Sequence, residues 1–182
     1  MAVIETVSGN DRVTITGTAS AHGATVPQQA VWVGAGEDRF EAPYQLGGVD
    51  HLECKVSARD TGGALVIFET FTQRTAVPTH LHHAQDEWFN VLEGEYNVRV
   101  GDETFHLRQG DSLLAPRQVP HAWSCVSHQA GKMIIVCQPA GTMESFFREL
   151  AAKIADEATA EEFQQVYRDH GMEIVGPPLP LE

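Results

Sequence analysis

The chain has 182 residues, 42% of them hydrophobic, and carries 12 lysines and arginines against 25 aspartates and glutamates, a net charge of −13. This length is typical of one domain, and the hydrophobic content is sufficient for a buried core. An acidic chain without a basic run is a poor fit to nucleic acid or to an anionic membrane surface, because both attract Lys and Arg. We therefore expect no nucleic-acid or membrane partner.

The N-terminal residues, MAVIETVSGNDRVT, lack the basic and apolar segments of a secretory signal peptide. No run approaches the roughly 18 apolar residues of a membrane span. The three cysteines, Cys54, Cys125 and Cys137, have wide spacings that fit neither a disulfide framework nor a cysteine zinc site. These features predict a cytoplasmic protein with reduced cysteines.

Short β-rich runs separated by turn residues such as Gly62-Gly63 and Gly101-Asp102 fill most of residues 13–137. Within 95–100, Tyr96, Val98 and Val100 alternate with polar residues, which is the period of a half-buried strand. Short strands at regular spacing predict a sandwich or barrel rather than βαβ units. The expected strands are 13–17, 30–34, 51–57, 64–71, 87–92, 95–100, 103–107, 111–115, 122–127 and 132–138.

The last quarter of the chain changes to a helical period. Thr159 and Glu162 have the spacing of a capping box, and Gly171 is placed to end the second helix. The proline-rich stretch 176–180 is expected to run extended along a surface. The two apolar stripes, which we expect to pack into the core, are Phe146, Phe147, Leu150 and Ile154, and Phe163, Val166, Tyr167 and His170.

These patterns predict a single all-β domain over residues 1–182. Its β core covers about 13–138, its two helices about 142–171, and its extended tail 172–182. Residues 1–50 carry the least information. Trp32 could cap a pocket or lie in a dimer interface, but core packing is the simplest expectation for it.

A group of metal-ligand residue types lies at 78–94, PTHLHHAQDEWFNVLEG. On a strand, His80 and His82 point to one face and His83 points away. A short turn can bring the Glu87 carboxylate back to the same place. Two imidazoles and a carboxylate suit a first-row divalent metal, and His121, after a turn bounded by prolines, is the best candidate for a fourth ligand. Three histidines and one glutamate leave open coordination positions, as a reactive site needs.

The remaining histidines have no ligand spacing. We expect them to be hydrogen-bonded or surface residues: His22, His51, His106, His128 and His170.

Two motifs in this chain resemble those of the cupin superfamily. The first is HxH, a short gap, Glu, six residues and Gly, and His80, His82, Glu87 and Gly94 meet every spacing. The second is Gly, five residues, Pro-x-Gly, two residues, His, three residues and Asn. Gly110, Pro116 and His121 fit it, whereas Gln118 and Cys125 replace the glycine and the asparagine. The replaced positions are not metal ligands in the family. Glutamine adopts φ > 0 less readily than the family's glycine, which bears on the geometry of the turn at Gln118.

The resemblance implies a jelly roll of two antiparallel sheets with the metal inside, often as a homodimer. The metal could be Fe, Mn, Co, Ni, Cu or Zn, since all accept these ligands. Alternation along the strands places Phe89 on the face of Glu87, and Trp123 and Cys125 on the face of His121. We expect Phe89, Trp123 and Cys125 to line an apolar pocket for a small, flat organic molecule.

The chain has one motif pair, the segment 146–150 (FFREL) and a Gly-Pro-Pro-Leu ending. These features resemble small bacterial cupins of the quercetinase-like group, among them flavonol dioxygenases of the quercetin 2,3-dioxygenase type. The resemblance implies a metal-dependent dioxygenase in which Glu87 is the general base and dioxygen attacks an enolisable aromatic substrate.

Two other classes of function stay open. One is a non-oxidative metalloenzyme (isomerase, cyclase, lyase or decarboxylase) in which Glu87 or His83 moves a proton. The other is a small-molecule-binding module without turnover. Fold alone does not choose among these classes.

Overall fold

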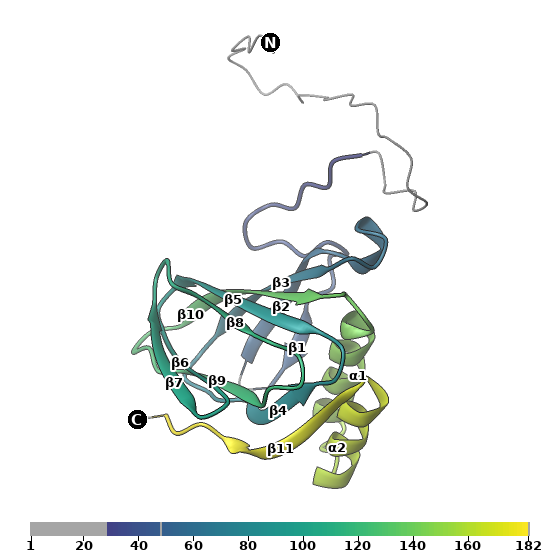
Figure 1. Ribbon diagram of the computed structural model, residues 1–182. Coiled ribbons are helices and arrows are strands. Elements are labelled where there is room, and N and C mark those ends of the chain that lie inside the picture. Colours follow the sequence, from purple (N-terminus) through teal and green to yellow (C-terminus); the bar gives the residue numbers. More distant parts are fainter. Residues whose placement is uncertain (1–28, 48, 182) are drawn as a thin grey trace.

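The computed structural model describes residues 29–181 apart from residue 48 (Figure 1). The expected strand 13–17 and His22 lie outside the described residues. The first elements in chain order are β1 (Tyr44–Leu46), β2 (Val49–Val56), a short 3-10 helix (Ala58–Asp60), β3 (Val66–Thr72), β4 (Pro78–His82), β5 (Asp86–Glu93) and β6 (Glu95–Val100). They are followed by β7 (Glu103–Arg108), β8 (Ser112–Ala115), β9 (His121–Cys125), β10 (Gly131–Gln138), α1 (Met143–Ala155), α2 (Ala160–Asp169) and β11 (Met172–Pro178).

Two antiparallel sheets face each other, as the sequence predicts. One has the order β1-β2-β3-β10-β5-β8, and the other has the order β11-β4-β9-β6-β7. The eight strands expected from 51–57 to 132–138 are all present, each within two residues at either end. Along β10, buried and half-buried residues alternate, so Met133, Ile135 and Cys137 face the core between the sheets. All three cysteines are buried and free.

The strand expected at 30–34 is wrong, because these residues form no strand and Trp32 is 84% exposed. The edge strand of this sheet is instead β1, which the sequence analysis did not predict. The expected core packing of Trp32 is therefore wrong as well.

The two helices close one side of the sandwich. Figure 1 shows α1 and α2 together beside β1 and β11, which are edge strands of the two sheets. The Thr159 capping box is present at the start of α2, and Gly171 follows its C-cap with φ 74°, both as predicted. Among the described residues, no helix is long and apolar enough to cross a membrane.

The helices do not end the fold, which corrects the expected order of elements. Instead of an unpaired tail, Met172–Pro178 forms β11 and pairs with β4, with Met172 opposite His82 and Ile174 opposite His80. Alternation of buried Met172 and half-buried Ile174 with exposed Glu173 and Val175 suits such a strand. Prolines are tolerated there because the outer side of an edge strand needs no N–H donor.

Candidate metal centre

Four side chains from three strands meet between the two sheets. His80 and His82 come from β4, His121 from β9 and Glu87 from β5, and one ligand atom of each lies within 4.8 Å of those of the others. The register of β4 and β9 places His80 opposite His121. Glu87 approaches from the other sheet. All four side chains are buried, so the residues that the sequence spacing selected are brought together.

Backbone contacts orient two of the imidazoles. The Nδ1–H of His80 donates to the Pro78 carbonyl oxygen at 2.9 Å, and that of His121 donates to the Val119 carbonyl oxygen at 3.0 Å. A carbonyl only accepts, so Nδ1 carries the proton and Nε2 is turned into the cluster. This is the common arrangement of metal-binding histidines, in which a hydrogen bond at one nitrogen fixes the ring for coordination through the other.

The carboxylate of Glu87 lies among the rings. Its Oε2 is 2.8 Å from His121 Nε2 and 3.4 Å from His82 Nε2. Burial alone would raise the pKa of Glu87, but the His121 hydrogen bond and the neighbouring imidazoles lower this pKa to about 2. Glu87 is therefore ionised at neutral pH despite its burial.

The histidines differ in their protonation. Burial, together with the charge of His121, lowers the pKa of His80 to about 3, and burial lowers the pKa of His82 despite the opposing charge of Glu87. Burial also acts to lower the pKa of His121, but the hydrogen bond and charge of Glu87 outweigh it and raise this pKa. Once His121 has released its proton, three neutral imidazoles and one carboxylate are a suitable donor set for a single divalent transition metal. The cluster therefore fits one metal ion.

The turn before β9 brings His121 into place. Gln118 has φ 64°, and its N–H donates to the His82 carbonyl oxygen at 2.7 Å. The turn therefore keeps the left-handed conformation that glycine favours, although glutamine occupies the position. The hydrogen bond from Gln118 also links this turn directly to β4, which carries His80 and His82.

A cavity of about 620 Å³ reaches this cluster. His80, His82 and Glu87 line it, as does Trp123, one of the three residues expected in the pocket. The structure does not place Phe89 and Cys125 in the lining. Phe89 is buried with its ring 6.3 Å from that of His121, and Cys125 lies at the far end of β9 with Sγ 3.7 Å from the Thr72 carbonyl oxygen.

The helices supply the wall of the cavity that the sequence analysis missed. Their apolar stripes were the available evidence, but they were expected to pack only into the core. The lining residues from α1 and α2 are Met143, Phe146, Phe147, Leu150, Ile154, Ala160, Phe163, Gln164 and Tyr167. Ala160 and Gln164 are exposed, which indicates that the cavity reaches the surface beside α2.

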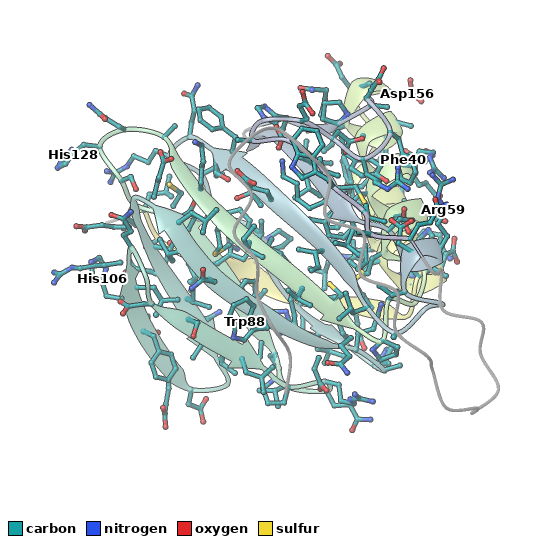
Figure 2. All side chains as sticks on the ribbon, turned by 90° about the horizontal axis from the view of Figure 1, so that it is seen from above. Phe40, Arg59, Trp88, His106, His128 and Asp156 are labelled. Carbon is teal, nitrogen blue, oxygen red and sulfur yellow. The ribbon has the colours of Figure 1, made fainter. Side chains whose placement is uncertain are left out.

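The other described histidines are hydrogen-bonded or exposed, as expected. His83 and His128 are exposed. His51 bonds to Glu53, His106 lies between Asn97 and Glu95, and His170 lies between Thr142 and Glu149. Figure 2 shows His106 and His128 at the periphery of the sandwich, pointing away from it.

Part of the chain matches a known family model. Residues 67–137 match the family model described as the cupin domain, and this range contains all four cluster residues. The HTH-type transcriptional regulator PuuR of Escherichia coli (strain K12) is 32% identical over 62 residues, which are 34% of this chain and 34% of that protein. The chain thus matches about a third of the length of this curated relative.

Solved structures with similarity to the chain include KdgF from Halomonas sp., with 18% identity and a TM-score of 0.48 over 54% of this chain and 87% of that chain. An RmlC-like cupin from Shewanella frigidimarina has 23% identity and a TM-score of 0.47 over 54% and 84% of the two chains. The polyketide cyclase RemF from Streptomyces resistomycificus has 19% identity and a TM-score of 0.46 over 53% and 72%.

Proposed function

Starting from a cupin domain at residues 67–137 with a buried cluster of three histidines and a glutamate, we propose that the chain is a metal-dependent dioxygenase for enolisable aromatic molecules. The observation that carries the proposal is the apolar cavity of about 620 Å³ that opens onto His80, His82 and Glu87. This volume falls within the range of about 300–1,000 Å³ typical of sites for small organic ligands.

The lining of the cavity supports this class of ligand. Among the described residues, no lysine, arginine or aspartate lines it, and aromatic and aliphatic side chains form most of its wall. An anionic substrate such as a sugar acid would lose its hydration there without gaining a cationic partner. An uncharged, flat molecule with a polar group at one end fits better, because its rings contact the apolar wall while its oxygens face the cluster.

His80, His82, Glu87 and His121 would hold the metal ion. When bound, a divalent transition metal supplies a Lewis acid that lowers the pKa of a coordinated enol, and it gives dioxygen a partner for reaction. The chain's own contribution begins with Glu87, whose carboxylate is ionised and can accept the proton of the enol hydroxyl at Oε2. The apolar wall keeps bulk water from the resulting electron-rich ring.

The proposed dioxygenase makes a small demand on the acid–base groups of the cavity. Among the described residues, the titratable side chains in the lining are His80, His82, Glu87 and Tyr167. A dioxygenase needs one proton acceptor, because both atoms of dioxygen enter the products and no external reductant is consumed.

An oxygen electrode tests this proposal directly. Protein loaded with each candidate metal is supplied with a panel of flavonols and other enolisable phenols, and we expect consumption of one dioxygen per substrate. Glu87→Gln should lose this uptake. Glu93→Gln is the matched control, because Glu93 is an exposed carboxylate that pairs with Lys132 on the surface. Equal conversion of a substrate without oxygen would reject the dioxygenase in favour of a non-oxidative metalloenzyme.

A further inference from the structure

Helix α2 places a phenol beside the metal cluster. Tyr167 is 7% exposed, and its side chain lines the cavity. Its ring stands nearly perpendicular to that of His80, with 5.6 Å between centroids and 74° between planes, and packs against Phe146 at 4.9 Å. The aromatic neighbours on both sides fix the ring in the wall of the cavity that Glu87 also lines.

No hydrogen bond joins the hydroxyl of Tyr167 to another of the described residues. This hydroxyl is also not among the fully buried polar atoms that lack a partner, so it is accessible from the cavity that the residue lines. A tyrosine hydroxyl usually has a hydrogen-bond partner, and one at a cavity surface finds it in water or in a ligand. A largely buried phenol whose hydroxyl is accessible from a cavity is placed to bind a ligand there.

We propose that Tyr167 is a ligand-binding residue whose hydroxyl donates a hydrogen bond to a carbonyl oxygen that the organic ligand presents at the cluster. The ligand class rests on the proposed function, whereas the donor role rests on the place of Tyr167 in the cavity wall, with its ring beside that of His80. Glu87 accepts a hydrogen bond and Tyr167 donates one, so the two groups are complementary to a hydroxyl next to a carbonyl. This pair would select enolisable hydroxy-ketones over phenols that lack the carbonyl.

The test compares Tyr167→Phe with the wild-type chain after both are loaded with Co²⁺ and kept free of oxygen. The probe is 3-hydroxyflavone, whose binding is followed by its absorption band. We expect Tyr167→Phe to weaken its binding by roughly fivefold or more, the usual effect of one lost hydrogen bond. We also expect the band of the bound probe to shift, because its carbonyl loses a donor. Cobalt content and thermal unfolding should be unchanged, since the ring and its contacts remain.

Tyr44→Phe is the matched control, because Tyr44 is a buried tyrosine outside the cavity lining. It should bind the probe as the wild type does. Equal affinity and an identical band in wild type and Tyr167→Phe would overturn the inference, as would the same loss in both variants.

Azide, a small anion that binds open metal positions, separates this inference from the proposed function. If the wild type binds no 3-hydroxyflavone, the proposed ligand class is wrong, and azide binding to the cobalt protein then decides the role of Tyr167. Weaker azide binding by Tyr167→Phe than by Tyr44→Phe would support a donor at the cluster. Equal binding, or no azide effect on the wild-type cobalt spectrum, would reject it.

Discussion

His121 and Glu87 form a buried pair across the gap between the two sheets, with Nε2 and Oε2 2.8 Å apart. Nδ1 of His121 donates to the Val119 carbonyl oxygen, and a proton on Nε2 would donate to Glu87. Burial acts to lower the pKa of His121, but the hydrogen bond and charge of Glu87 outweigh it and raise this pKa, which favours the protonated ring in the metal-free protein. A metal ion needs the Nε2 lone pair of the same ring. The proton on His121 must therefore leave when the metal binds.

The apparent affinity for a divalent metal should fall as the pH falls. The metal-free protein keeps the proton on His121 up to a pKa raised above the ordinary 6.5, whereas the metal-bound protein lacks it. Below that pKa, each pH unit should weaken binding about tenfold, and above it the affinity should level off. His80, with a pKa of about 3, should release no second proton. Calorimetric titration with Zn²⁺ at several pH values measures this slope, and an affinity independent of pH would contradict the pairing.

Metal binding should stabilise the fold, because the cluster joins the two sheets. At a free metal concentration 100 times the dissociation constant, the free energy of unfolding should rise by about 2.7 kcal/mol. His82→Gln should lose most of this gain, whereas His106→Gln should keep it, since His106 is an exposed histidine outside the cluster. Thermal unfolding with and without metal provides the comparison. Equal metal-dependent gains in the two variants would argue against coordination by His82.

Local spacing was sufficient to predict the cluster. The i, i+2 separation of His80 and His82 fixes a shared face on any strand, and the short gap to Glu87 limits where its carboxylate can lie. His121 could be added because the expected strand at 122–127 follows a turn with prolines at both ends. These are properties of short segments, and neighbouring elements in the fold did not override them.

The extent and the lining of the cavity could not be predicted as fully from the sequence. Alternation places Phe89 and Cys125 on the inner faces of their strands, but it does not tell how far along the face a cavity extends. The stripes in α1 and α2 have the same period whether they cover a filled core or an open space. β11 was missed because its prolines argue against a strand, and only the unpaired edge of β4 makes room for it. The expected homodimer stays a prediction.

Gln118→Gly should raise the stability of the protein. The left-handed backbone at Gln118 strains any residue with a Cβ, and glycine removes that strain at the cost of a more flexible unfolded chain. The net gain should be about 0.5–1 kcal/mol in denaturant unfolding. Gln109→Gly is the control: Gln109 is exposed and has no positive φ, so glycine there should only destabilise. If both substitutions lower the stability equally, the turn at Gln118 is not strained.

Thr159→Ala should destabilise α2 and, through it, the wall that carries Phe163 and Tyr167. The Thr159 side chain accepts from the Glu162 N–H, and the Glu162 carboxylate accepts from the Thr159 N–H at 2.9 Å. Losing such an N-cap should cost about 1 kcal/mol in denaturant unfolding.

The capping box of Thr159 and Glu162 should make the stability of the protein depend on pH. The hydrogen bonds from the backbone and side chain of Thr159 lower the pKa of Glu162 to about 2 from its ordinary 4.5. A lowered folded-state pKa means that this contribution is complete above pH 4.5 and disappears as the pH falls through about 2. The difference in stability between wild type and Thr159→Ala should therefore shrink over that interval. Thr159→Ala keeps the backbone N–H that bonds Glu162, so the difference reports the Thr159 hydroxyl alone. A difference that stays constant down to pH 2 would show that this hydroxyl does not act through Glu162.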